Sequence, residues 1–255
     1  MTERTGAIHI HTAYSHDGRD SVPSLREFAR ARGLSFLGIT DHAEDFDAAK
    51  YAALQAECAA NSDTTIQLIA GLEFRFAGYP GLHLLALGLS EFITPQTPGE
   101  FIRQTRDRSR FTVAAHPILY DYVLPDEVTA GINAIEVWNA GYNTRFLPDP
   151  KAIRLLQRVR LARPDVVGTA GLDQHDARND RETRVILAAD APADPLDALR
   201  SGRFRNRGRT MSFGPHGRWP AAGLGLLSLA RIGFDRVERT QDRVSRWLRR
   251  QRLPR

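Results

Sequence analysis

Residues 7–11 read AIHIH, a short apolar run that ends in two potential ligands, His9 and His11. The same pattern of an apolar run followed by polar side chains recurs along the chain. The further runs are 35–40, 66–76, 83–89, 111–115, 134–138 and 166–170. Most have the roughly four to eight residues that are typical of buried parallel strands.

Helix-like segments separate several of these runs. The first begins at Ser21 and Pro23 and ends before Gly33, with residues that favour helix ends on both sides. Further candidates cover residues 46–60, 98–108 and 150–163. Alternating strands and helices indicate parallel β/α units. About seven strands predict an α/β fold that closes as a barrel or a variant of one.

The last quarter of the chain has a different pattern. Residues 192–195 and 202–217 are predicted to be loops, and from residue 221 leucines alternate with arginines. This pattern predicts one or two amphipathic helices outside the barrel. We therefore predict a barrel domain over residues 1–200, followed by a basic loop and amphipathic helical extension over residues 201–255.

Composition narrows the class of protein. Cys58 is the only cysteine among the 255 residues, which excludes an intrachain disulfide and a cysteine-based zinc site. No apolar stretch reaches the roughly 18 residues of a transmembrane segment, and the first ten residues lack the apolar run of a signal peptide. We expect a cytoplasmic protein.

The net charge of +5 is unevenly distributed. Residues 201–255 hold 14 arginines and three acidic residues, a net charge of +11, which leaves about −6 for the first 200 residues. The basic end could contact nucleic acid, anionic lipid or a partner protein, or it could simply be a solvated surface. The apolar strip at 224–234 is predicted to pack on the barrel or to form a homodimer contact.

Imidazoles and carboxylates follow the apolar runs in a regular way. Pairs at positions i and i+2 end the first and last runs, so each pair can point to one face of its strand. The full set of candidate metal ligands is His9, His11, Asp17, His42, Glu73, His83, His116, Asp173 and His175. The carboxyl ends of parallel strands share one rim, where barrel enzymes place their chemistry. The set should therefore converge there.

This mixture of ligands suits Zn²⁺, Mn²⁺ or Fe²⁺ better than Ca²⁺. A single four-coordinate ion uses three or four protein ligands, and the chain offers more. A bridging carboxylate such as Glu73 would let two or three divalent ions share them. Two ions about 3.5–4 Å apart can hold a phosphoryl group and activate water.

The order of these motifs resembles the PHP (polymerase and histidinol phosphatase) superfamily. The resemblance rests on His9-x-His11, Asp17-Gly18, Asp41-His42, Gly71-x-Glu73, His83, His116-Pro117 and Gly171-x-Asp173-x-His175, with Glu136-x-x-Asn139 before the last motif. It covers roughly residues 6–190. It implies a distorted (β/α)7 barrel with a trinuclear metal centre that hydrolyses phosphate esters.

Residue by residue, the resemblance implies three metal positions. His9, His11, Glu73 and Asp173 would hold the first ion; Glu73, His83 and His116 the second; and Asp17, His42 and His175 the third. Metal-activated hydroxide would attack phosphorus in line, while the metals take up charge on the phosphoryl oxygens. His42 or His175 could protonate the leaving oxygen, which makes both candidate catalytic residues.

One departure from the family pattern concerns the third metal. Many relatives have Ser-Asp-Gly, whereas here His16 stands between Ser15 and Asp17. Asp17 is the preferred ligand because the Asp-Gly pair is retained, and His16 is the alternative. Asp41 is a further catalytic candidate: it could orient an imidazole, or it could cap a helix.

Substrate binding requires a cation beside the metals. Arg145 is the first candidate for gripping phosphate, Arg75 the second, and Asn139 is a candidate polar contact. The leading prediction is a hydrolase of small phosphomonoesters or cyclic phosphodiesters. The alternatives are an exonuclease-like protein that processes nucleic acid, which is not favoured, and a non-catalytic metal-stabilised scaffold with a basic docking tail.

Overall fold

The computed structural model describes residues 3–143 and 146–234. Contacts divide the chain into two compact units, Met1–Arg218 and Trp219–Arg255. In the second unit, residues 221–234 are helical, as predicted, and residues 235–255 of the predicted extension lie outside the described part. Among the described residues, no helix is both long and apolar enough to cross a membrane.

The elements of the first half of the first unit are largely the predicted ones; the short strand at 41–42 and the 3-10 turn at 43–45 were not predicted, and the predicted run 66–76 divides into two strands. The elements are β1 (Thr5–Ile10), α1 (Val22–Ala31), β2 (Phe36–Ile39), β3 (Asp41–His42), a 3-10 turn η1 (Ala43–Asp45), α2 (Ala48–Ala60), β4 (Gln67–Ile69), β5 (Gly71–Arg75), β6 (His83–Leu87), α3 (Pro98–Thr105) and β7 (Phe111–Ala114). The side chain of Ser21 caps α1 and that of Asp47 caps α2.

The second half of the unit contains both predicted and unpredicted elements. It comprises η2 (Pro117–Tyr120), α4 (Asp126–Gly131), β8 (Ala134–Asn139), α5 (Pro150–Ala162), β9 (Val167–Gly171), η3 (Ala177–Asn179), β10 (Arg184–Leu187), α6 (Pro195–Arg200), β11 (Phe204–Arg207) and β12 (Ser212–Phe213). The prediction of loop over 202–217 is wrong, because β11 and β12 lie there and extend a sheet past residue 200.

Hydrogen bonding organises the strands into two mixed six-stranded sheets. Their orders are β12-β11-β10-β1-β2-β4 and β3-β5-β6-β7-β8-β9. Pairing is parallel for β1-β2, β2-β4, β3-β5, β7-β8 and β8-β9, and antiparallel around β6, β10 and β11. The expectation of parallel units is wrong for those three strands: a short connection turns the chain back between β5 and β6, whereas β10 pairs with β1, which is far away in the sequence.

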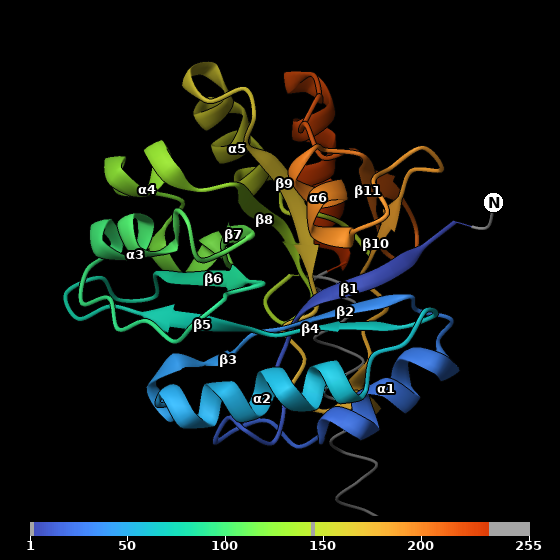
Figure 1. Cartoon of the computed structure of the whole chain (residues 1–255). Coiled ribbons are helices and arrows are strands. Elements are labelled where there is room, and N and C mark those ends of the chain that lie inside the picture. The colour runs from blue at the N-terminus through green and yellow to red at the C-terminus, as the bar shows by residue number, and fades with distance from the viewer. Residues whose placement is uncertain (1–2, 144–145, 235–255) are drawn as a thin grey trace, which may run out of the picture. The chain divides into compact units, whose positions relative to one another are not determined.

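The two sheets meet where β1 passes the end of β9. An isolated parallel bridge joins Ile10 to Gln174, and the amide of Leu172 donates to the carbonyl of Ile8. The strands of the described residues do not form a continuous closed ladder, so the fold is an α/β arrangement consistent with a distorted barrel. Figure 1 shows the strands inside and the helices α1 to α5 outside them.

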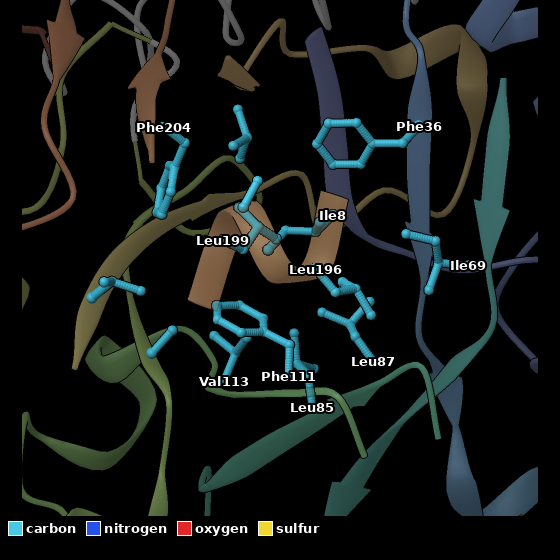
Figure 2. Packing of buried hydrophobic residues seen from close by; sticks show 14 of the residues in the cluster. Ile8, Phe36, Ile69, Leu85, Leu87, Phe111, Val113, Leu196, Leu199 and Phe204 are labelled. Carbon is cyan, nitrogen blue, oxygen red and sulfur yellow. The ribbon is translucent and has the colours of Figure 1, made fainter. Parts of the chain in front are cut away.

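A hydrophobic core fills the space between the strands. Ile8 of β1, Leu85 of β6 and Phe111 of β7 point toward one another, and Leu196 and Leu199 of α6 pack against them (Figure 2). All five side chains are buried. Glu73 is the register partner of Leu85, so the two side chains share one face of the sheet. The polar cluster described below therefore adjoins the apolar core.

A separate buried ion cluster links α1 to β10. The Asp180 Oδ2 atom lies 2.5 Å from Arg184 Nη2 and 2.9 Å from Arg32 Nε, and Oδ1 accepts a bond from the amide of Glu182. The side chains of Asp180 and Arg184 are almost fully buried. Burial raises the pKa of Asp180, but the hydrogen bond and charge of Arg184 outweigh burial and lower it. Both carboxylate oxygens are thus satisfied within the protein.

Candidate metal centre

The end of β1 is distorted in a way that aims its histidines. The register of β1 against β2 shifts between Ile8 and Ile10, and His9 adopts a left-handed backbone with φ of 63°. Bulges of this kind redirect side chains near active sites. His9 and His11 are both fully buried, with ring centroids 5.4 Å apart. The two histidines therefore converge, although not through the regular strand alternation that the sequence suggested.

Glu73 on β5 lies at the centre of the histidine cluster. Its Oε1 atom lies 2.7 Å from His83 Nδ1 and 3.1 Å from His116 Nε2. Its Oε2 atom lies 3.5 Å from the Nε2 atoms of both His9 and His11. The two oxygens thus face two different sets of imidazoles, which is the arrangement of a carboxylate able to bridge two cations.

Asp173 and the first two histidines form a second group. Asp173 Oδ1 lies 3.5 Å from His9 Nε2 and 3.6 Å from His11 Nε2. Ligand atoms within 4.8 Å of one another define three groups of potential metal ligands among the described residues. The groups are His9, His11 and Asp173; His9, Glu73 and His116; and His11, Asp17, His42 and His175. His83 contacts Glu73 but belongs to none of them.

The third group distinguishes Asp17 from His16. Asp17 Oδ2 lies 3.2 Å from His42 Nε2 and 3.3 Å from His175 Nε2. The His16 side chain is 56% exposed, and its Nδ1 atom lies 2.8 Å from Asp45. The position of Asp17 supports its preference as a ligand, and His16 stacks on the His42 ring at 5.5 Å.

Glu136 on β8 is a site residue that was not among the predicted ligands or catalytic groups. Its Oε1 atom lies 2.7 Å from His9 Nδ1, and its Oε2 atom accepts from the amide of His116 and from Asn139 Nδ2. A carboxylate on the second nitrogen of a ligating histidine fixes its tautomer and orientation. A Cβ at Gly171 would come within 1.9 Å of Glu136 Oε1, so this glycine makes room for the contact.

The cluster leaves buried ligand atoms without hydrogen-bond partners. Among the described residues these include His9 Nε2, both ring nitrogens of His11, His116 Nδ1 and Asp17 Oδ1. Leaving such polar atoms buried and unpaired costs about 1–3 kcal/mol each. Imidazole nitrogens and carboxylate oxygens are the donors that Zn²⁺, Mn²⁺ and Fe²⁺ accept. The orphaned atoms and the chemistry of the donor set fit the divalent ions that the motifs imply.

Electrostatics also distinguish the parts of the cluster. Burial of Glu73 opposes ionisation, but the charge on His9 and hydrogen bonds from His116 and His83 outweigh it and hold the pKa of Glu73 well below its usual value. Burial also disfavours protonated His9, yet Glu136, Asp173 and Glu73 raise its pKa. Carboxylate charge thus dominates the interior of the cluster, which favours a cation there.

The imidazoles of the third group behave differently. Burial lowers the pKa of His42, with His11 and Arg75 adding to the effect, and burial and His11 lower the pKa of His175. Both are therefore neutral near pH 7. A neutral imidazole binds a cation readily but has no proton to spare for a leaving group. Their environment fits ligands better than general acids.

Asp41 holds the loop that carries Asp17. Its Oδ1 atom accepts from the amide of Thr12 and the hydroxyl of Ser15, and its Oδ2 atom accepts from the hydroxyl of Thr12. Asp47 caps α2, so the proposed cap role of Asp41 is wrong. Its contacts also join loop groups instead of an imidazole. Asp41 positions the loop and does not face the open side of the site.

The substrate-binding candidates lie in different environments. Arg75 is 45% exposed, and its Nη2 atom lies 3.2 Å from His42 Nε2, so it stands at the open edge of the cluster. Asn139 is 1% exposed; its Nδ2 donates to Glu136 and its Oδ1 accepts from the amides of Gly141 and Tyr142. It supports the cluster from within and offers nothing to a substrate. Arg145 lies outside the described residues.

Residues 7–125 match the PHP domain. The match contains every motif from His9 to His116, and it confirms the resemblance read from the sequence over that range. Asp173 and His175 lie beyond it and join the PHP-domain residues through the contacts described above. No curated protein matches the sequence significantly.

Two solved structures share the fold of the chain. PsfC from Pseudomonas syringae superimposes with a TM-score of 0.57 at 16% identity, covering 93% of this chain and 100% of that chain. A candidate metal-dependent phosphoesterase from Bifidobacterium adolescentis gives a TM-score of 0.50 at 18% identity, covering 68% and 88%. At these identities the similarity concerns the fold that surrounds the PHP domain motifs.

Proposed function

We propose that the chain is a metal-dependent phosphoesterase that hydrolyses phosphate esters of small molecules. One observation carries the proposal: mostly buried imidazoles and carboxylates, on or just after β1, β3, β5, β7 and β9, converge around Glu73 with ligand atoms left unpaired. The match to the PHP domain and the similarity to a candidate phosphoesterase support the same class of reaction. We also propose that the two sheets together correspond to the distorted (β/α)7 barrel that the family resemblance implies.

The proposed ligands divide among two or three ions. His9, His11, Glu73 and Asp173 would hold the first, and Glu73, His83 and His116 the second. Asp17, His42 and His175 would hold the third, with His11 close enough to contribute. When bound, divalent ions supply Lewis acidity, which makes water a stronger nucleophile and offsets phosphoryl charge.

The protein's own groups have separate tasks. Glu136 holds the Nδ1 proton of His9, so that His9 Nε2 is presented toward Glu73 and Asp173. Arg75 supplies a partly exposed guanidinium beside His42, where it can donate to the phosphoryl oxygens of a bound ester. Burial of the inner residues excludes water from one side of the centre and strengthens every charge interaction within it.

The test is a joint measurement of metal content and turnover. The purified protein would be loaded with Mn²⁺, Zn²⁺ or Fe²⁺, its bound ions counted, and phosphate release followed with a panel of phosphomonoesters and cyclic phosphodiesters. We expect two or three ions per chain and hydrolysis of at least one ester class. Fewer than one ion per chain would contradict the metal centre, and a full complement of ions without any turnover would favour the scaffold alternative.

A further inference from the structure

A groove lined by aromatic side chains is bounded on one side by Arg75, which also contacts the proposed ligand His42. The volume of the groove is ≈ 570 Å³, and its walls come from η1 and the start of α2, the end of β5, and the segment 92–96. Four phenylalanines, Phe46, Phe74, Phe76 and Phe92, line it. Phe74 and Phe76 are buried, whereas Phe46 and Phe92 are half-buried.

Arg75 connects this groove to the metal cluster. The residue lines the groove, and its Nη2 atom lies 3.2 Å from Nε2 of the proposed ligand His42. Its Nη1 atom lies 3.3 Å from Oε1 of Glu44, which also lines the groove. Arg75 therefore links the groove to the cluster, and a phosphate held by its guanidinium would lie within one side chain of the groove.

The side chains that line the groove determine which organic group of a phosphate ester would bind there. Aromatic rings pack favourably against other rings, in offset or edge-on contacts. Glu44 and Asp47 stand at the same groove and repel a second anionic group. We infer that the groove binds the neutral aromatic leaving group of a phosphate monoester, which Arg75 aligns with the metal centre. This inference rests on the proposed phosphoesterase function.

The reaction is an ordinary hydrolysis. Water supplies the oxygen that forms the new bond to phosphorus, the bond from phosphorus to the ester oxygen breaks, and the leaving oxygen takes up a proton that the attacking water releases, so that the aromatic alcohol and phosphate are the products. The groove contributes binding energy for the ring and takes no part in the covalent change. Its loss should therefore affect aromatic esters selectively, while esters without a ring are spared.

Two substrates and two groove variants separate this inference from other effects. The value of kcat/KM would be measured for 1-naphthyl phosphate and glycerol 2-phosphate with the Mn²⁺-loaded wild type, Phe92→Ala and Ala77→Trp. Phe92→Ala removes one wall, and Ala77→Trp fills the groove from an exposed position. Leu161→Ala, on the exposed face of α5, is the matched control. Comparing each variant with the wild type cancels the intrinsic difference between the two leaving groups.

We expect both groove variants to lower kcat/KM for 1-naphthyl phosphate about five- to tenfold, with glycerol 2-phosphate within about twofold of wild type. Equal effects on both substrates, or no effect on either, would overturn the aromatic subsite. Ala77→Trp keeps the test valid if Phe92→Ala does not fold.

A binding measurement separates failure of the groove from failure of the enzyme. The proposed function fails only if no ester of the full panel, cyclic phosphodiesters included, is hydrolysed. In that case, or if only these two monoesters resist hydrolysis, the Kd of 1-naphthyl phosphate for the metal-loaded protein is measured from its fluorescence. A Kd about fivefold weaker in Phe92→Ala than in Leu161→Ala would still support the aromatic groove. Equal Kd values would overturn it.

Discussion

Two buried charged clusters in this chain are built on opposite plans. In the Arg32–Asp180–Arg184 cluster, both carboxylate oxygens of Asp180 have partners, and the guanidinium of Arg184 also bonds the carbonyl of Thr183. In the cluster around Glu73, several buried nitrogens and one carboxylate oxygen have none. The fold alone explains a cluster that satisfies itself, whereas the unpaired buried atoms of the other cluster fit the metal centre that we propose.

The contrast shows which property distinguishes a structural ion pair from a ligand site. Both clusters join distant segments, and both have carboxylates with lowered pKa values. Burial and pKa direction therefore do not separate a structural ion pair from a ligand site. The count of unpaired donor atoms separates them, and variants in each cluster should change different observables.

The largest effect should come from Glu73→Gln. The substitution removes the charge that faces both sets of imidazoles, so we expect fewer than one ion per chain and a loss in kcat/KM of at least about 10³-fold. Metal analysis and phosphate release measure both quantities. Glu91→Gln, on a largely exposed side chain, is the control and should behave as wild type. Retention of all ions by Glu73→Gln would contradict the hypothesis that the Glu73 carboxylate is shared between two ions.

Asp17→Asn tests the third group of ligands. The change weakens the carboxylate that lies near His42 and His175, so we expect the loss of one ion while the others stay bound. His16→Asn is the paired variant and should keep all ions, because His16 faces Asp45. The reverse result from metal analysis of the two proteins would assign the ligand to His16.

Asp180→Asn should damage the fold and leave the metals alone. Arg184 would stay buried without its counter-charge, so the free energy of unfolding should fall by about 3 kcal/mol. Denaturant unfolding measures the loss, and metal analysis should show an unchanged ion count. Asp190→Asn breaks an exposed pair with Arg203 and should cost no more than about 1 kcal/mol. Loss of an ion from Asp180→Asn would contradict a purely structural role for the Asp180 cluster.

Glu136→Gln should weaken metal binding without abolishing it. An outer carboxylate on a ligating histidine is typically worth about 10–100-fold in metal affinity, and Glu136 also holds the backbone of His116. Competition with a chelating dye measures the change. Glu127→Gln, on the exposed side of α4, is the control. An affinity within twofold of wild type would show that His9 needs no help in orientation.

The smallest expected effect is the loss of the stabilising contribution of Asp180 at low pH. The folded pKa of Asp180 is depressed, so its contribution to stability is present above the unfolded pKa of about 3.9 and is lost as pH falls through the lower folded value. The difference in unfolding free energy between wild type and Asp180→Asn should therefore shrink as pH falls below about 4. A difference that stays constant down to pH 2 would mean that the charge of Asp180 is not what stabilises the cluster.

The sequence predicts the strands from β1 to β9 other than β3, and most helices, because local patterns determine them. The apolar runs that end at His11 and His116 are strands, and the Ser21 and Pro150 signals begin helices as expected. The antiparallel course of β6 depends on a short connection from β5, and β10 depends on pairing with β1, a strand that is distant in the sequence. Neither leaves a local signal in the sequence.

The same limit applies to the site. Motif spacing identifies residues that could be ligands, and the structure brings nearly all of them together. Motif spacing could not show that the side chain of Asn139 is fully hydrogen-bonded to Glu136 and to backbone amides, or that Asp41 holds a loop in place. Those roles depend on which neighbour is within about 3 Å, and residues far apart in the chain supply that neighbour.

The left-handed backbone of three proposed ligands bears on protein design. His9, His116 and Asp173 have φ values of 63°, 27° and 49°, a region that non-glycine residues seldom occupy. An idealised barrel with regular strands would present the same side chains along different vectors. Grafting the nine residue identities onto such a scaffold should therefore give a poor chelator, and a successful transplant would have to copy the irregular turns of the main chain as well.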